Sequence, residues 1–289
     1  MTSFPPNLSP AFNDESATAH PDLMSEVEYN KAFERMARDY FTGRLPQEKP
    51  QLFYVTGLPG SGKSTYVEGQ LTANPALKDY VHINFDDLRI YHPRYAEHVG
   101  KEPINAAARI DQSVERLIGW LTEEATKRQL NVLLDDAAMG KDITRAIFAP
   151  FQTAGYEITA SVIAIPSSIA RQAVHLRFEE NFAAAAKGDS VIPRWVNSEE
   201  QDNAPAALIE TVETLQDNIS AKLRVVSRSG VVLLGNAAVV TKAETQRELN
   251  DLEKNDYQSK AQAISGLLAE RGRKPAAPAP KKPGSQITA

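Results

Sequence analysis

The chain has 289 residues, of which 42% are apolar and 24% are charged, as expected of a globular protein with a sizeable core. The formal net charge of −5 provides no global basic field for nucleic acid, and the absence of cysteine excludes disulfides, thiolate–zinc sites and thiol catalysis. No signal-peptide pattern is visible, and no apolar run approaches the roughly 20 residues that span a bilayer. We therefore expect a cytoplasmic protein without a membrane or nucleic-acid partner.

The first segment with a helical pattern follows a polar N-terminal arm. Residues 1–22 are rich in Pro, Ser, Asn and Ala and show no periodicity, so we expect them to be flexible. Ser25 and Glu28 form a capping-box pattern, and the apolar side chains that follow recur at helical spacing. This predicts a helix within residues 23–48, ended by Pro46, that packs on the edge of the next domain.

Residues 49–238 alternate between strand-like and helix-like patterns. Short apolar runs bounded by turn residues predict strands, and longer segments with an apolar stripe predict helices. The strands are expected at 51–56, 80–84, 131–135, 157–165, 222–226 and 231–234. The helices are expected at 62–71, 104–128, 141–154, 167–187 and 203–217. This alternation predicts an α/β domain with a mainly parallel sheet and helices on both faces.

A charged segment follows the α/β domain. Thr241 and Glu244 form a second possible capping box, which predicts one charged C-terminal helix over residues 239–270. Residues 271–289 contain four prolines, five basic residues and no acid, so we interpret them as a disordered basic tail. This tail is either solvated or makes a weak contact with an acidic partner.

A glycine-rich motif follows the first predicted strand of the α/β domain. The P-loop pattern G-x-x-x-x-G-K-[ST] is matched at every fixed position by Gly57-Leu58-Pro59-Gly60-Ser61-Gly62-Lys63-Ser64. Its glycines allow backbone N–H groups to converge on phosphate oxygens, and the helix N-terminus adds the positive end of its dipole. The expected nucleotide-binding residues are Gly57, Gly60, Ser61, Gly62, Lys63, Ser64 and Thr65. A glycine-rich turn without nucleotide is the alternative, which the flanking strand and helix disfavour.

Acids end the two strands that come after the P-loop. The chain has no N-K-x-D segment for reading guanine, which argues against a GTPase and favours a small-molecule kinase. In such a kinase, an acid after the next strand accepts the proton of the acceptor hydroxyl. We choose Asp86 over Asp87 for this role; a helix cap or a solvated loop acid is the alternative. Asp135 is the candidate to hold magnesium with the Ser64 hydroxyl, although many strands end in Asp.

Two arginines are candidates to stabilise the transferring phosphate. Arg177 lies in the predicted helix 167–187, and Arg194 lies in a loop between Pro193 and Trp195. Phosphoryl transfer needs cations where charge spreads over the γ-phosphate. An exposed arginine is usually a solvated surface residue, so spacing alone does not single out either one.

Together these segments resemble the zeta-toxin family of P-loop kinases over roughly residues 27–235. The resemblance rests on the order and spacing of several pieces: the P-loop, Ile83 to Arg89 followed by His92-Pro93, the strand ending at Asp135, Ala154 to Glu157 before the next strand, Ile165-Pro166, Arg177-Phe178-Glu179 and Arg194. The stretch from Phe148 to Ile165 is especially similar.

The resemblance implies a particular activity. Members of the family use ATP to phosphorylate a hydroxyl of UDP-N-acetylglucosamine or a related UDP-sugar, and an antitoxin protein blocks their nucleotide site. By this resemblance, Lys63 and Ser64 bind ATP and Mg²⁺, and Asp86 is the general base. Arg177 and Arg194 then clamp the phosphates.

The acceptor side departs from the family pattern in two places. The family commonly has an acid, Gly and Thr after the third strand, whereas this chain has Asp135-Asp136-Ala137, and Met139 stands where an arginine often occurs. On the preceding predicted helix, the register of a substrate-binding glutamate of the family falls on Gly119. Glutamates stand one helical turn away on either side, at Glu115 and Glu123.

These departures leave three hypotheses open. The first is a zeta-type kinase of a UDP-sugar. The second is a kinase of the same fold that acts on another hydroxyl, such as that of NAD, another dinucleotide or a nucleic-acid end. The third is a nucleotide-binding interaction protein without catalysis. The intact P-loop, Asp86 and the two arginines argue against the third hypothesis.

Overall fold

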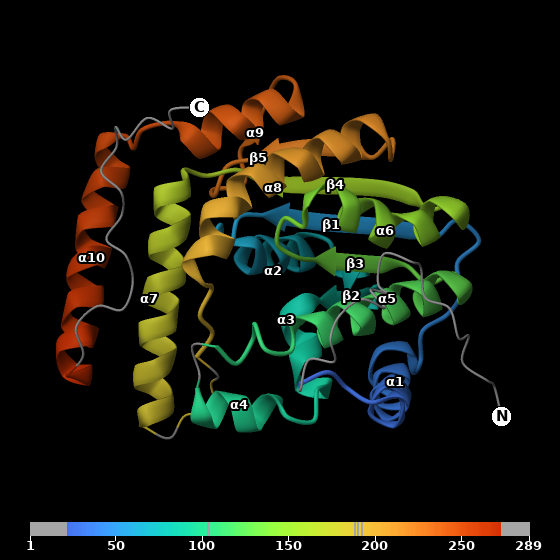
Figure 1. Ribbon diagram of the computed structural model, residues 1–289. Helices are drawn as coiled ribbons and strands as arrows, with labels where there is room; N and C mark the ends of the chain where they lie inside the picture. The colour runs from blue at the N-terminus through green and yellow to red at the C-terminus, as the bar shows by residue number, and fades with distance from the viewer. Residues whose placement is uncertain (1–21, 103–104, 188, 190, 192, 273–289) are drawn as a thin grey trace.

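A six-stranded sheet forms the centre of the molecule (Figure 1). The computed structural model describes residues 22–272 except 103–104, 188, 190 and 192. The strands are β1 (Gln51–Gly57), β2 (Val81–Asn84), β3 (Val132–Asp135), β4 (Glu157–Ile163), β5 (Lys222–Val226) and β6 (Val232–Leu233). Their order is β2-β3-β1-β4-β5-β6, and every neighbouring pair is parallel except β5 and β6. The predicted mainly parallel sheet is therefore confirmed.

Helices cover both faces of this sheet, as predicted. They are α1 (Glu26–Phe41), α2 (Lys63–Ala73), α3 (Phe85–Leu88), α4 (Tyr95–Lys101), α5 (Asp111–Lys127), α6 (Gly140–Thr153), α7 (Ser167–Ala186), α8 (Ser198–Asp217), α9 (Ala237–Gln246) and α10 (Asp251–Arg271), with short 3-10 turns η2 (Pro75–Asp79) and η3 (Arg89–Tyr91). Leu52 and Tyr54 of β1 join a core cluster with α1, α5 and α6. Phe53 and Val55 join a second cluster with α2, α7 and α8. Strand β1 reads as a continuous apolar run because both of its faces are buried.

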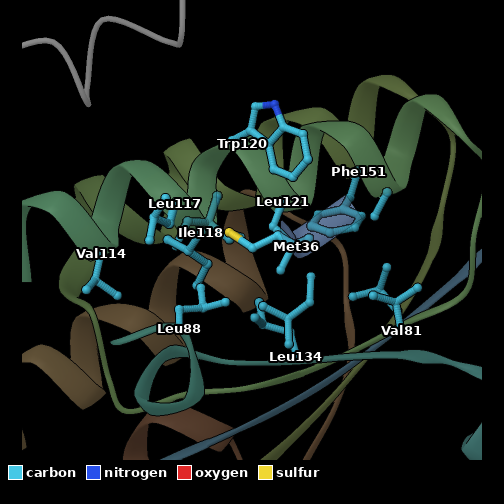
Figure 2. Close-up of a cluster of buried hydrophobic side chains, with 14 of the residues drawn as sticks. Met36, Val81, Leu88, Val114, Leu117, Ile118, Trp120, Leu121, Leu134 and Phe151 are labelled. Atoms are coloured by element: carbon cyan, nitrogen blue, oxygen red, sulfur yellow. The ribbon is translucent and has the colours of Figure 1, made fainter. Parts of the chain in front are cut away.

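Helix α1 is part of the larger core rather than an appendage. Figure 2 shows Met36 among the apolar side chains of α5, with Leu121 close by, and Met36 is completely buried. Phe33 stacks on Trp120 of α5 with ring centroids 4.6 Å apart. Burying a large apolar side chain stabilises a fold by about 1.5–3 kcal/mol. The predicted capping box of Ser25 and Glu28 is present at the start of this helix.

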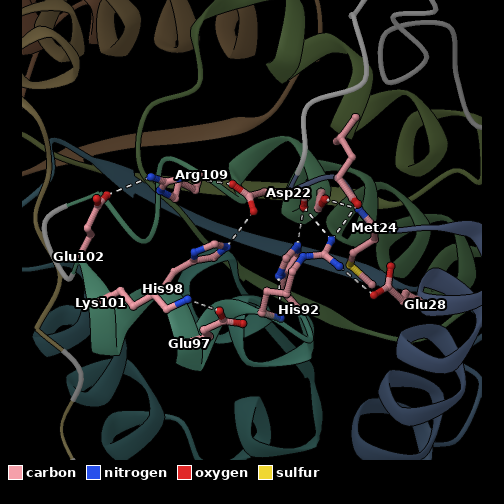
Figure 3. Close-up of polar contacts among 12 residues, drawn as sticks. Asp22, Met24, Glu28, His92, Glu97, His98, Lys101, Glu102 and Arg109 are labelled. Atoms are coloured by element: carbon pink, nitrogen blue, oxygen red, sulfur yellow. Dashed lines mark hydrogen bonds and ion pairs between the residues drawn. The ribbon is translucent and has the colours of Figure 1, made fainter.

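The segment before α1 is held by a cluster of charged groups (Figure 3). The Asp22 carboxylate lies 3.0 Å from His98 Nε2 and 3.3 Å from Arg109 Nη1. The Asp22 carbonyl oxygen is 2.9 Å from His92 Nε2 and accepts a hydrogen bond from Arg94. Arg94 also pairs with Glu28 at 3.0 Å. These contacts fasten the N-terminal segment to α4 and to the segments on either side of that helix.

Two helices begin at residues other than those predicted. Helix α5 begins at Asp111 instead of near residue 104, because residues 105–110 form successive turns in its place. Helix α8 begins at Ser198 instead of 203 and continues through Pro205. A proline inside a helix leaves the carbonyl four residues earlier without its partner. Here that carbonyl belongs to Gln201, and it accepts a hydrogen bond from Arg171 Nη2 at 3.2 Å.

The single charged helix predicted over 239–270 is wrong, because two helices occupy this region. Asn236 caps α9, and Thr241, expected as a cap, is buried inside that helix. Arg247 ends α9 with extended backbone angles, and its guanidinium bridges acids on both sides of the bend. The capping box of this region lies nine residues beyond the predicted one, at Asn250 and Glu253, and opens α10.

Several predictions concern residues outside the described part of the chain. The flexible arm over 1–22 and the disordered basic tail over 271–289 fall there almost entirely. The proposed boundaries between arm, kinase domain and C-terminal region also stay predictions. Within residues 22–272, no described helix is long and apolar enough to cross a membrane.

Candidate nucleotide and acceptor site

The P-loop lies at the carboxyl end of β1, between β3 and β4. In open parallel sheets, ligands usually bind in a crevice at the carboxyl ends of the strands. A Cβ on Gly60, where φ is +81°, would lie 2.3 Å from the Ala170 carbonyl oxygen, so only glycine fits there. A Cβ on Gly57 would lie 2.6 Å from a backbone oxygen of β4. Helix α2 begins at Lys63 after Gly62, which provides no side-chain cap, so the first N–H groups are left for phosphate oxygens.

A cavity of about 290 Å³, here called the P-loop cavity, opens beside this loop. It is lined by Pro59, Gly60, Gly62, Lys63, Ser64, Thr65, Asn84, Asp86, Asp135, Asp136, Ala137, Ala173, Arg177, Arg194 and Arg228. Every site residue expected from the sequence lines it except Gly57 and Ser61. These two shape the loop from behind: Ser61 is fully buried, and its backbone N–H donates to the Leu58 carbonyl at 3.0 Å.

The Lys63 ammonium group folds back onto the loop. Its Nζ atom donates to the carbonyl oxygens of Gly57 and Leu58 at 3.3 and 3.2 Å. Loss of hydration lowers the pKa of Lys63 to about 8, although the nearby Asp135 and Asp136 oppose that shift. A bound phosphate would replace the weak carbonyl contacts and restore a full positive charge to this lysine.

Two adjacent carboxylates at the end of β3 have one free oxygen each among the described residues. Asp135 Oδ2 accepts a hydrogen bond from Asn84 at 3.1 Å, and its Oδ1 is buried without a partner. Asp136 Oδ1 accepts from the Ala137 N–H at 2.6 Å, and its Oδ2 is also buried without a partner. Burial raises the pKa of both groups, that of Asp136 to about 7. A buried oxygen without a protein partner is uncommon in a native fold, and a bound ion, ligand or water satisfies such a group.

Asp86 projects into the P-loop cavity from the first turn of α3. Asn84 supplies the helix cap by accepting from the Asp86 N–H at 2.8 Å, so neither Asp86 nor Asp87 has that role. The Asp86 carboxylate pairs with Arg89 Nη1 at 2.5 Å and with Arg194 Nη1. Asp87 is exposed and lines neither of the two cavities at this site.

Three arginines line the P-loop cavity from different elements. Arg177 comes from α7, and burial, followed by repulsion from Arg89, lowers its pKa. Arg194 comes from the loop before α8, and burial lowers its pKa to about 10. Neither is a solvated surface residue. Arg228 comes from the turn between β5 and β6 and was not expected, because a single arginine in a polar turn carries no sequence signal.

A second cavity of about 230 Å³, here called the acidic cavity, adjoins the first. The two share Asp136, Ala137 and Arg194. The polar lining of the acidic cavity adds Arg89, Asp111, Glu115 and Glu200. Its apolar lining consists of Phe85, Ile118, Ala138, Met139, Ile143 and Ile147.

The carboxylates of the acidic cavity come from α5 and α8. Burial raises the pKa of Asp111, Glu115 and Glu200. Glu115 and Glu123 stand one helical turn from Gly119 on either side, and only Glu115 lines the acidic cavity. The carboxylate of Glu123 lies 3.8 Å from Lys127 Nζ on the same helix. Glu200 was not expected, because it lies in an acidic run before the helix predicted at 203–217.

These features define the class of the protein: an α/β protein with a P-loop nucleotide site at the carboxyl edge of a parallel sheet. The family model described as Zeta toxin matches residues 36–238. The chain therefore belongs to the Zeta toxin family, in agreement with the resemblance found in the sequence.

Two relatives support this assignment. Toxin zeta of Streptococcus agalactiae is 22% identical over 230 residues, which cover 78% of each chain. A structure from the PezAT chromosomal toxin–antitoxin system of Streptococcus pneumoniae has a TM-score of 0.70 at 17% identity. That match covers 86% of this chain and 99% of the other, and it shows a shared fold.

Proposed function

We propose that the protein is an ATP-dependent kinase that transfers the γ-phosphate to a sugar hydroxyl of UDP-N-acetylglucosamine or a related UDP-sugar. The observation that carries the proposal is the convergence on one cavity of the P-loop, the acid Asp86 and the arginines Arg177 and Arg194. A second cavity adjoins it where an acceptor would meet the γ-phosphate. A protein that only bound nucleotide would have no need for the acid or the second cavity.

The nucleotide half of the proposed reaction uses the P-loop. Its N–H groups and Lys63 would hold the β- and γ-phosphates of ATP, with Thr65 at the cavity wall. The residues present also fit Mg²⁺, with the Ser64 hydroxyl and the unpartnered Oδ1 of Asp135 as its protein ligands. When bound, the ion would neutralise charge on the phosphates. No three acidic or histidine side chains of the described chain form a metal cluster, which suits an ion held mainly by phosphates and water.

The acceptor half uses Asp86 as the general base. The carboxylate would take the proton of the acceptor hydroxyl while that oxygen bonds to the γ-phosphorus and the bond to the ADP oxygen breaks. In the structure both carboxylate oxygens of Asp86 are occupied by guanidinium groups. We propose that the acceptor hydroxyl displaces Arg194, which then moves to the γ-phosphate with Arg177 and stabilises the spreading charge.

The identity of the acceptor is the finer part of the proposal. Carboxylates such as Glu115 and Glu200 are suited to accept hydrogen bonds from sugar hydroxyls, and the apolar wall suits a ring face. A second acceptor class, another nucleotide or a dinucleotide such as NAD, is favoured by one observation. Ala137 and Met139 line the acidic cavity where the family commonly has Thr and often Arg.

The test is ATP turnover by the purified protein against UDP-sugars, NAD and other dinucleotides, with the phosphorylated product identified by mass spectrometry. Phosphate on a UDP-sugar supports the first acceptor class, and phosphate on a dinucleotide replaces it with the second. If no acceptor is phosphorylated while ATP still binds, the kinase proposal fails and a non-catalytic role takes its place.

We further propose that the protein acts in the cytoplasm as the toxin of a toxin–antitoxin pair. Its partner would be a small antitoxin that covers the P-loop cavity. The cationic lining of Lys63, Arg177, Arg194 and Arg228 suits an acidic segment of such a partner. Expression of the wild-type chain should arrest a bacterial host, and co-expression of the protein encoded by the neighbouring gene should prevent the arrest. Normal growth without that protein would contradict the toxin role.

A further inference from the structure

Helix α10 lies beyond the matched family region and packs along α7, the helix that carries Arg177. The family match ends at residue 238, and α10 covers Asp251–Arg271. Figure 1 shows α10 running beside α7 on the side away from the sheet. The buried residues of α10 are Ile264 and Leu268, and Gln172 Nε2 of α7 donates to the Tyr257 carbonyl at 2.6 Å.

The last residue of α10, Arg271, makes a buried ion pair with α7. Its Nη1 atom lies 3.0 and 2.8 Å from the two carboxylate oxygens of Glu179. The side chains are only 9% and 4% exposed. The guanidinium also lies over the rings of Phe182 and Phe178, 4.3 and 5.7 Å from their centroids. Removing Arg271 would leave the buried Glu179 carboxylate facing His175 Nε2, 3.7 Å away, in place of its close ion pair, and breaking a buried pair in this way is destabilising locally.

Aromatic contacts connect this ion pair to the loop of Arg194. Trp195 packs edge-on against Phe178 with ring centroids 5.2 Å apart, and against His175 at 5.6 Å. Phe178 is almost completely buried, and its ring contacts both Arg271 and Trp195. Arg194 precedes Trp195 in the chain and reaches Asp86 in the P-loop cavity. An unbroken set of contacts therefore runs from the end of α10 to the phosphate clamp.

We propose that Arg271 is a positioning residue for the phosphate clamp, acting through Glu179, Phe178 and Trp195 on Arg194. This inference rests on the proposed kinase function. Arg271 itself touches neither cavity. Its role is to hold the surface of α7 against which Trp195 packs. Trp195 in turn keeps the side chain of Arg194 in position in the P-loop cavity. A packed contact of this kind transmits an effect because the buried side chains have few alternative arrangements.

The first test compares Arg271→Ala with Lys254→Ala in steady-state kinetics. Lys254 is a basic residue of the same helix, half exposed, whose recorded ion pair is with Asp251. We expect Arg271→Ala to lower kcat by about threefold to tenfold, with the KM for ATP changed less than about twofold. Arg271→Lys, which keeps charge but loses the planar fork, should lie between wild type and Arg271→Ala. Lys254→Ala should equal wild type.

A double-mutant cycle separates positioning from general loss of stability. If Arg271 acts through Arg194, Arg271→Ala should have little further effect on kcat in the Arg194→Lys protein. A merely structural role predicts the same fold-loss of kcat in both backgrounds. Equal losses in both backgrounds, or wild-type kcat for Arg271→Ala, would overturn the inference.

A second readout does not depend on turnover. In the Trp120→Phe protein, Trp195 is the remaining tryptophan of the chain. Arg271→Ala should shift its fluorescence to longer wavelength and increase quenching by acrylamide, and Lys254→Ala should do neither. If wild type phosphorylates no acceptor but Trp195 responds in this way, the proposed function fails and the structural coupling stands. If turnover is present and Trp195 does not respond, the coupling fails alone.

Discussion

The P-loop cavity and the acidic cavity share a wall but are assembled differently. Much of the first comes from one continuous segment, Gly57 to Thr65, supported by the ends of β2 and β3. The second is assembled from α3, η3, α5, α6, α8, the loop after β3 and the loop before α8, which form no single motif. A site for phosphate needs backbone N–H groups in one tight turn, so it is conspicuous in a sequence. A site for a sugar or base needs only side chains that converge in space.

The charges of the two cavities also differ. The P-loop cavity contains four cations, Lys63 and three arginines, against the three carboxylates of Asp86, Asp135 and Asp136, and the excess of cations suits a polyphosphate. The acidic cavity adds three carboxylates and one arginine, Arg89, which is already paired with Asp86 and Asp111. The contrast suits two different chemical groups, and under the proposed function transfer would occur where the cavities meet, beside Asp136 and Arg194.

The substitution with the largest expected effect on phosphoryl transfer tests the P-loop cavity. Lys63→Ala should abolish phosphoryl transfer, because the lysine supplies charge to phosphate and its aliphatic part adds little packing. ATP turnover and the thermal midpoint should be measured on the same preparation. The midpoint should stay near that of wild type. Turnover close to wild type would remove the basis of the kinase proposal.

The next effect tests the proposed general base Asp86, which lines the P-loop cavity and pairs with Arg194, a residue shared by both cavities. Asp86→Asn should lower kcat by about 10² to 10⁴ with little change in ATP affinity, because a general base acts on the acceptor. Asp87→Asn is the matched control: its side chain is exposed and lines neither cavity. Kinetics and ATP binding should be compared for both variants. A larger loss in Asp87→Asn would mean that the base is misplaced by one residue.

A smaller effect is expected from the two arginines proposed to clamp phosphate. Arg177→Lys and Arg194→Lys keep a positive charge but lose the fork that contacts two oxygens. Each should reduce kcat by at least about tenfold, or roughly 1.4 kcal/mol of barrier, with a smaller change in ATP affinity. Expression of either variant should no longer arrest a bacterial host. Unchanged turnover in both variants would contradict the proposed clamp.

The substitution with the smallest expected effect on catalysis tests the acidic cavity. Glu115→Gln should raise the KM for the acceptor by about threefold to tenfold, the range of one hydrogen bond, and leave the KM for ATP unchanged. Glu123→Gln is the control on the same helix, since Glu123 does not line the cavity. If the two variants behave alike, the acceptor does not contact Glu115 and the acidic cavity has another purpose.

The structure agrees with the sequence most closely where the local pattern is strong. The strand predicted at 222–226 is β5 with the same bounds, and the capping box of Ser25 and Glu28 opens α1 as expected. The prediction fails where two local signals compete. Thr241 with Glu244 matches a capping box, but Asn236 begins the helix earlier and buries Thr241 inside it.

The sequence by itself determined the nucleotide half of this protein. Strand, glycine turn, lysine and helix follow one another in the chain, so the geometry that binds phosphate is encoded locally. The βα alternation likewise determined the parallel sheet, because parallel neighbours require helical crossovers. The resemblance to zeta toxins added Arg177 and Arg194, whose roles no spacing indicates.

Only the tertiary structure decided the composition of the acidic cavity and the packing behind Arg194. Glu115 rather than Glu123 faces the acidic cavity because of the rotation of α5, and Glu200 reaches it because α8 begins early. Arg271 lies more than seventy residues from Arg194 in the chain. It contacts Phe178, the residue that packs against Trp195, only because α10 packs on α7. These pairings depend on packing between distant elements, and local sequence carries little information about such packing.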